Sequence, residues 1–392
     1  MTLRPPPNPA VVVMGYDRPD SLSQLLASLD RASIPEGTPL VVSIDGGGRR
    51  GDEVVDRARR HRWSHGDSEV VTHDHLGLVD HFHRCGDLTA RFGSIVLLED
   101  DLVVGPAFHQ WATAALTAAE PDDRIAGVCL SAPWFDGYWH LPFEPVLDGS
   151  DGFYAQLPWF HGLAWTTRMW RGYRDWTAAP TDTPIHAAFD QLDTDEWFPG
   201  AVRHLVSTGR HHLLPRWPHA TNTGAAGQHF DVGSDVFQVP VVQTDRLGEV
   251  RITPLDDALA VYDDHMELLP DRLARLCPDL ADADLTVDLL GVRDLGRVTT
   301  SHVLTTRPVR RAERTWGTSR RPLAMNLVGD EVGVGISLAR TVDVRTDQVA
   351  DRVTRHRLAA HAAHDRPPGP RSILRSTADR LVARLDGIRR DR

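Results

Sequence analysis

Three acidic side chains stand in a row at the end of an apolar segment. Glu99-Asp100-Asp101 follow Ser94-Ile95-Val96-Leu97-Leu98, a run typical of a strand buried on both faces. Carboxylate oxygens are hard ligands, so this group suits Mn²⁺ or Mg²⁺. Because alternate residues of a strand point to opposite faces, we expect Glu99 and Asp101 to face the metal, with Asp101 the first-choice ligand, while Asp100 faces away. The alternative is a solvated acidic turn that caps a helix starting near Pro106.

Two earlier predicted strands also end in polar residues. Residues 10–14 form an apolar run broken by Gly15-Tyr16-Asp17-Arg18-Pro19, and residues 39–44 are closed by Asp45-Gly46-Gly47-Gly48. Open α/β sheets bind ligands at the carboxyl ends of their strands. Arg18, Asp45 and the acidic triplet are therefore predicted to share one edge of a sheet.

A helix is expected between the first two of these strands. Asp20 or Ser21 can cap its N-terminus. Its apolar face is formed at helical spacing by Leu22, Leu25, Leu26 and Leu29. The β-α-β unit predicts an α/β fold with a Rossmann-like, mixed but mostly parallel sheet.

The composition excludes several classes of function. The chain has 392 residues, a formal net charge of -11 and no lysine, so that all 43 basic side chains are arginines. An acidic chain has no general affinity for nucleic acid. Mechanisms that need an amine, such as a Walker-type phosphate loop or a pyridoxal Schiff base, are excluded. Phosphate must be bound by arginine, backbone or metal.

The cysteines and the N-terminal residues indicate the compartment. Cys85, Cys129 and Cys277 lie far apart without a C-x-x-C pair, which disfavours structural zinc and disulfides. The apolar run at residues 11–14 is too short for a signal core or a membrane span. We expect a cytoplasmic protein.

The order of the motifs resembles a known enzyme family. The likeness to the N-acetylglucosaminyltransferase I family and its bacterial family-2-like relatives is carried by Val11-Val12-Val13-Met14-Gly15-Tyr16-Asp17-Arg18-Pro19, then Val42-Ser43-Ile44-Asp45-Gly46, then Val96-Leu97-Leu98-Glu99-Asp100-Asp101-Leu102. This resemblance implies a GT-A fold. It also implies inverting, metal-dependent transfer of a sugar from a nucleotide sugar, a UDP-sugar by preference, to a hydroxyl of a glycan or lipid-linked acceptor.

The resemblance assigns roles to the strand-end residues. It implies Asp101 and Glu99 at the metal, Arg18 near the nucleotide and Asp45 on the edge of the base, with Asp100 among the cofactor-binding residues. These roles agree with the chemistry, because an Asp can accept a uracil N–H and an Arg fork can bind phosphate oxygens.

Two histidine pairs precede the triplet. His81-Phe82-His83-Arg84 occupies the place of the family's H-Y-R-W-like helix, which implies that His81 contacts the nucleotide. Without the family, His73-Asp74-His75 and His81-Phe82-His83 are two H-x-H units of the kind that bind zinc. Neither unit lies at the end of an apolar strand.

The catalytic base is expected on the acceptor side, because an inverting transferase needs a carboxylate to take the proton of the attacking hydroxyl. Phe160-His161-Gly162-Leu163-Ala164-Trp165 resembles the family's G-L-G-W segment, and Asp193-Thr194-Asp195-Glu196-Trp197 stands where the family has an acidic pair before a Trp. This likeness assigns the base to Glu196, with Asp195 second. The family has Asp at the position of Glu196, and Asp190 and Asp193 are alternatives.

A later segment resembles a loop of the bacterial relatives that closes over the donor. It contains Gly227-Gln228-His229-Phe230, and the likeness assigns His229 to the phosphate or the metal. A core or solvent histidine is the alternative interpretation.

Four parts are predicted along the chain: a nucleotide-sugar-binding half (1–120), a Trp-rich acceptor-binding half (121–262), a C-terminal extension (263–365) and a basic amphipathic tail (366–392). The tail fits a peripheral membrane or partner helix, with a solvated packing helix as the alternative. Its apolar face is formed by Leu374, Ala378, Leu381, Val382 and Leu385.

Two other functions stay open at this point. A sugar-phosphate nucleotidyltransferase shares the α/β architecture and the acidic metal site, but usually opens with a Gly-rich loop that this N-terminus lacks. A non-catalytic carbohydrate-binding protein of the same fold would explain the many tryptophans, which can stack on sugar faces.

Overall fold

The computed structural model describes residues 8–135, 141–192, 195–225, 233, 235, 237–329 and 332–345. A nine-stranded sheet runs through most of them. In spatial order it contains β11 (Val261–Tyr262), β7 (Gly152–Ala155), β9 (His211–Pro215), β6 (Ile125–Cys129), β8 (Leu163–Thr166), β4 (Ser94–Glu99), β1 (Ala10–Gly15), β2 (Leu40–Ile44) and β3 (Ser68–Thr72).

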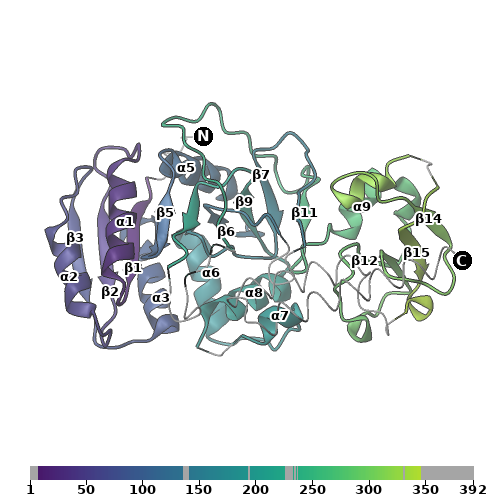
Figure 1. Ribbon diagram of the computed structural model, residues 1–392, viewed down its shortest axis with the longest axis horizontal. Helices are drawn as coiled ribbons and strands as arrows, with labels where there is room; N and C mark the ends of the chain where they lie inside the picture. The colour runs from purple at the N-terminus through teal and green to yellow at the C-terminus, as the bar shows by residue number, and fades with distance from the viewer. Residues whose placement is uncertain are drawn as a thin grey trace, which may run out of the picture.

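Two smaller sheets complete the strands of the described residues. A ribbon pairs β5 (Leu102–Val104) with β10 (Ala220–Asn222), and a four-stranded sheet has the order β12 (Leu285–Asp288), β13 (His302–Thr305), β15 (Ile336–Arg340) and β14 (Arg314–Trp316). Figure 1 shows the large sheet crossing the molecule from β3 to β11, with the four-stranded sheet beyond β11.

Helices alternate with strands from β1 to β3, and later helices and strands occur in groups. The helices are α1 (Pro19–Asp30), α2 (Gly51–Arg60), α3 (Leu78–Asp87), α4 (Thr89–Phe92), α5 (Phe108–Ala119), α6 (Thr167–Thr177), α7 (Ala187–Asp190), α8 (Trp197–Thr208) and α9 (Pro270–Leu276). Short 3₁₀ turns occur at Pro278–Leu280, Leu295–Arg297, Leu323–Leu327 and Thr341–Asp343.

Strand directions place the predicted motifs at one edge. β1 pairs in parallel with β2 and β4, and β2 pairs in parallel with β3. β8 lies antiparallel between β4 and β6, so β6 points the same way as β4. The predicted fold class, an α/β fold with a mixed, mostly parallel sheet, is confirmed.

The first β-α-β unit forms as the apolar pattern predicts, except at the start of its helix. All six residues of β1 are buried, and so are the four leucines of α1. The helix begins at Pro19, and Arg18 is its N-cap residue, without a capping side-chain bond. The prediction that Asp20 or Ser21 caps it is wrong, because proline at the first helical position already fixes φ and needs no N–H partner.

The tryptophans of residues 121–262 mostly belong to the core. The side chains of Trp159, Trp165, Trp170 and Trp197 are all buried. Among the described tryptophans, large exposure is found at Trp134 and Trp217. The Trp-rich composition therefore reflects aromatic packing, and it lends little support to a stacking surface for sugars.

The C-terminal extension contains a folded sheet that weak periodicity did not predict. Leu285, Leu304, Trp316 and Ile336 from its strands join the main hydrophobic cluster of the chain. The predicted tail, residues 366–392, lies outside the described residues. In the part of the chain that the structure describes, none of the helices has the length and apolar character to cross a membrane.

Candidate active site

Asp100 is buried at the turn that follows β4 and is held by two hydrogen bonds and an ion pair. Its Oδ2 accepts the backbone N–H of Tyr16 at 3.1 Å, its Oδ1 accepts from Nε of Arg18 at 2.9 Å, and Nη2 of Arg18 lies 2.6 Å from the same Oδ1. Burial raises the pKa of Asp100 to about 6 although Arg18 favours the charged form. Asp100 therefore ties the loop after β1 to the end of β4.

Arg18 also reaches the next carboxylate. Its Nη1 donates to Oδ2 of Asp101 at 2.8 Å, and its side chain is 25% exposed. The pKa of Arg18 is raised: burial lowers it, and the charges of Asp100, Asp101 and Glu99 more than compensate. The guanidinium of Arg18 thus acts as the counter-ion of the triplet in this structure.

Glu99 and Asp101 lie close enough for strong repulsion between their charges. The pKa of Glu99 rises to about 8, chiefly through burial and then through the charge of Asp101, with a further contribution from Glu196. Two half-buried carboxylates that repel each other form a donor set that suits a hard divalent cation, which would relieve the repulsion. Glu99 and Asp101 therefore fit the metal that the sequence predicts.

Glu196 approaches this centre from the N-terminus of α8. It precedes α8 as the N-cap residue, and it is near enough to Glu99 to raise that group's pKa. The following residue, Trp197, stacks on Phe82 of α3 with ring centroids 4.5 Å apart and planes 3° apart. This stack joins the helix before the triplet to the helix that presents Glu196.

The other candidates for the base lie in different surroundings. Asp190, at the end of α7, forms an ion pair with Arg203 of α8. Asp195 is exposed to solvent. Asp193 falls outside the described residues. The structure thus brings Glu196 to the acidic triplet.

Asp45 organises the loop that opens α3. Its Oδ1 accepts the N–H groups of Leu76 at 2.7 Å and Gly46 at 2.9 Å, and its Oδ2 accepts that of Gly77 at 3.0 Å. His75 lies 3.3 Å away from the same carboxylate. Asp45 lies at the predicted sheet edge, with its bonds directed at the protein's own backbone.

His81 is buried beneath this loop. Its Nε2 and that of His73 each lie 2.9 Å from the hydroxyl of Ser43 on β2. Burial lowers the pKa of His81 to about 4, so the ring is neutral near pH 7. Ser43 is a polar residue in the middle of an apolar strand, and that mismatch was the available sequence signal for this buried triad.

The H-x-H units do not form a metal site in the described part of the chain. His75 contacts the backbone oxygen of Gly46 at 2.9 Å, and His83 packs against Trp170 and Tyr173. None of these histidines belongs to a described group of three possible ligands within 4.8 Å.

Such a group occurs instead after β11. Asp263, Asp264 and His265 have possible ligand atoms within 4.8 Å of one another. Asp263 is already paired with Arg293, and Nδ1 of His265 lies 2.9 Å from Asp264. The N–H of His186 also donates to Asp264, so both carboxylates are already bonded within the protein. The adjacent residues Asp263-Asp264-His265 are the sequence signal for this group.

The two-stranded ribbon of β5 and β10 lies beside the acidic triplet and positions the segment that follows β10. β10 pairs antiparallel with β5, and the N–H of Thr223 donates to the backbone oxygen of Asp101 at 2.7 Å. His229, six residues later, lies outside the described residues.

Comparisons with known proteins do not establish the function of the chain. No family model matches the chain, and no curated protein matches its sequence. A crystal structure of TarS from S. aureus, residues 1–349, superposes with 10% sequence identity and a TM-score of 0.36, covering 55% of this chain and 61% of that one. The match spans less than two thirds of TarS.

Proposed function

We propose that the chain is an inverting, metal-dependent glycosyltransferase that moves a sugar from a nucleotide sugar to a hydroxyl of a glycan or lipid-linked acceptor. The observation that carries the proposal is the approach of Glu196 to Glu99 at the carboxyl edge of the sheet, beside the ion-paired Arg18. The proposed cation ligands and a candidate base are thereby close to each other.

The position of each residue suggests its proposed role. Asp101 and Glu99 would hold Mn²⁺ or Mg²⁺, and the cation would neutralise a departing diphosphate. Asp100 keeps the loop after β1 in place through Tyr16 and Arg18. With no lysine in the chain, Arg18 is the cationic side chain at the triplet, and it would contact phosphate once the cation takes over its carboxylate partner.

Glu196 is the proposed base. The hydroxyl attacks the anomeric carbon as the bond to the diphosphate breaks, and the hydroxyl proton passes to the Glu196 carboxylate. Glu196 stands at the N-terminus of α8, on a different element from the proposed cation ligands. This position suits a group that contacts the acceptor and not the donor. Asp45 and His81 support the nucleotide side by fixing the loop and helix there.

The proposal is tested by incubating the protein with Mn²⁺ and a panel of nucleotide sugars and measuring release of nucleoside diphosphate. Slow release that EDTA abolishes and that Asp101→Asn removes is expected. Asp20→Asn is the matched control, because Asp20 is an exposed carboxylate on α1 whose partner is Arg50.

Other results of the same assay contradict the proposal. Release of pyrophosphate identifies a nucleotidyltransferase. Binding of donor without any release, in the presence of simple sugar acceptors, identifies a non-catalytic binding protein. Equal activity in Asp101→Asn and the parent chain removes the triplet from the reaction.

A further inference from the structure

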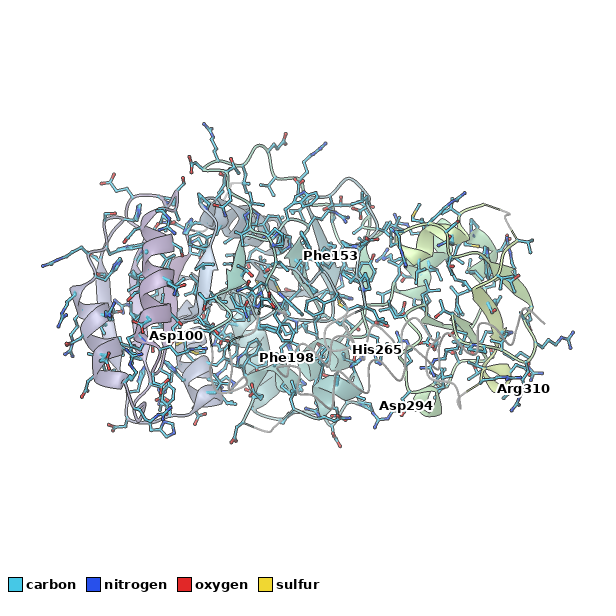
Figure 2. The ribbon with its side chains drawn as sticks, viewed as in Figure 1. Asp100, Phe153, Phe198, His265, Asp294 and Arg310 are labelled. Carbon is cyan, nitrogen blue, oxygen red and sulfur yellow. The ribbon has the colours of Figure 1, made fainter. Side chains whose placement is uncertain are left out.

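A cavity of about 430 Å³ lies between the large sheet and the four-stranded sheet. Three segments line it: residues 141–146, residues 262–268 after β11, and parts of residues 289–335. In Figure 2, His265 lies on this side of Phe198, towards the C-terminal sheet, while Asp100 lies on the other side. The cavity is therefore separate from the acidic triplet.

The cavity wall holds a buried carboxyl group with unused bonding capacity. Glu267 is only 3% exposed and lines the cavity. One oxygen, Oε1, accepts the N–H of Leu290 at 2.6 Å, and within the described residues Oε2 has no hydrogen-bond partner. Burial, and after it the charge of Asp288, raises the pKa of Glu267 well above its usual range, which favours the neutral carboxyl form.

The loop that presents Glu267 is rigidly held. Oδ1 of Asp263 accepts the N–H groups of His265 at 2.9 Å and of Glu267 at 3.1 Å. Met266, between them, has φ of 58°, a conformation that costs a residue with a side chain of order 1 kcal/mol. These hydrogen bonds hold the loop in the conformation in which Met266 and Glu267 line the cavity.

The rest of the lining combines hydrogen-bonding groups with apolar walls. Thr318, Arg321 and Glu144 are exposed side chains that line it, and Phe143 and Leu290 give it apolar surface. The Tyr262 ring is fixed there, because its hydroxyl accepts the N–H of Val146 at 2.8 Å. The wall is therefore preformed.

We propose that this cavity binds an uncharged saccharide unit. A purely apolar ligand would leave Oε2 of Glu267 without a partner, which costs free energy. The exposed lining carries one side chain of each charge, Glu144 and Arg321, so it favours neither an anion nor a cation. A pyranose carries hydroxyls that donate and accept for Glu267 and Thr318, and its C–H faces pack on Phe143 and Leu290. Its volume also suits a cavity of this size.

The test is binding of neutral disaccharides to the full chain. Maltose, cellobiose and N,N'-diacetylchitobiose are titrated by saturation-transfer NMR, with glucuronic acid and glucosamine as charged comparators. At least one neutral disaccharide is expected to bind more tightly than both comparators. Thr318→Val combined with Arg321→Met should weaken that binding about tenfold, because it removes two hydrogen-bonding groups.

Two further variants keep the test decisive. Leu323→Trp fills the cavity and should abolish binding, whereas Thr299→Val combined with Arg310→Met changes the same residue types on exposed positions outside the lining and should leave binding intact. If no neutral disaccharide binds, or if the cavity variants bind like the parent chain, the proposal is wrong. Binding should persist in Asp101→Asn, so the result is independent of the proposed transfer reaction.

Discussion

Arg18 binds Asp100 through two nitrogens that share one carboxylate oxygen, Nε at 2.9 Å and Nη2 at 2.6 Å from Oδ1. The side chain of Asp100 is 2% exposed, so this pair is the main compensation for burying its charge. The pair also joins the residue before α1 to the turn after β4. It is thus both a stability element and the support of the proposed cation ligands.

Arg18→Met should destabilise the fold by about 3–5 kcal/mol, because it leaves the buried Asp100 carboxylate without its partner. Arg18→Lys should restore little, since a single ammonium cannot reproduce the fork that reaches Asp100 and Asp101 together. Urea unfolding at pH 7.5 measures both losses.

The matched control for this prediction is Arg50→Met. Arg50 pairs with Asp20 and Glu53, all well exposed, and ion pairs between exposed side chains contribute little to stability. Equal losses of unfolding free energy in Arg18→Met and Arg50→Met would show that the Arg18 pair does not compensate for the burial of the Asp100 carboxylate.

Glu196→Gln should lower turnover by about 10²–10⁴-fold, the usual effect of removing a general base. Affinity for the donor should change little, because the role proposed for Glu196 is on the acceptor side. The readout is nucleoside diphosphate release, with kcat separated from KM. Asp190→Asn and Asp195→Asn serve as comparisons, and loss of turnover in Asp195→Asn with retention in Glu196→Gln would assign the base to Asp195 instead.

The buried histidines predict loss of stability in acid. Burial lowers the pKa of His161 and His212 to about 3 and that of His204, His211 and His219 to about 4. Below pH 6.5, the usual pKa of histidine, these side chains bind protons in the unfolded chain, whereas in the folded chain they stay neutral until a lower pH. The free energy of unfolding should therefore fall from pH 6.5 towards pH 4, by about 1.4 kcal/mol per pH unit for each histidine.

The His161→Leu variant isolates one of these contributions. Neither ring nitrogen of His161 has a hydrogen-bond partner, so leucine removes a titrating group without breaking a bond. Between pH 6.5 and 4, the slope of the free energy of unfolding against pH should decrease by the contribution of one proton, which is about 1.4 kcal/mol per pH unit. Raised pKa values at Glu99 and Asp100 act in the opposite direction, but they are the same in both proteins. An unchanged slope would contradict the neutral state of His161.

Two helical glycines should respond to alanine with opposite signs. A Cβ at Gly86 of α3 would lie 2.1 Å from Cζ2 of the buried Trp170, whose indole N–H bonds to Asp87 at 2.8 Å. Gly86→Ala should cost about 1–3 kcal/mol through overpacking. Gly200 of α8 has only the Tyr173 hydroxyl near, at 3.8 Å. Gly200→Ala should gain about 0.5–1 kcal/mol from helix propensity.

Thermal and urea unfolding of the two variants measure this difference. The same substitution in two helices of one protein controls for the general effect of alanine. If both variants are stabilised, Trp170 can move away and the close approach of α3 is not a constraint.

The strand ends could be predicted because short-range rules determine them. The apolar runs before Arg18, Asp45 and Glu99 need burial on both faces, and this requirement is visible in the residues themselves. The N-cap of α1 was predicted two or three residues too late, because Pro19 and the acidic residue after it offered competing N-terminal signals. Local preferences of similar strength leave such boundaries open.

The rest of the site depends on contacts between distant segments. The ion pair of Arg18 with Asp100 spans 82 positions in the chain, and the approach of Glu196 to Glu99 depends on the packing of α8. The sheet from β12 to β15 consists of strands of three to five residues. Segments this short carry too few alternations to separate a strand from a loop.

The stack of Phe82 on Trp197 limits how the proposed site can work. Both rings are almost fully buried, and separating them would expose apolar surface at a cost on the order of 5 kcal/mol. A hinge that opened between α3 and α8 would carry this cost in every catalytic cycle. The parts of the protein that carry α3 and α8 should therefore behave as one rigid block, and substrate exchange should be governed by the loops at the carboxyl edge of the sheet.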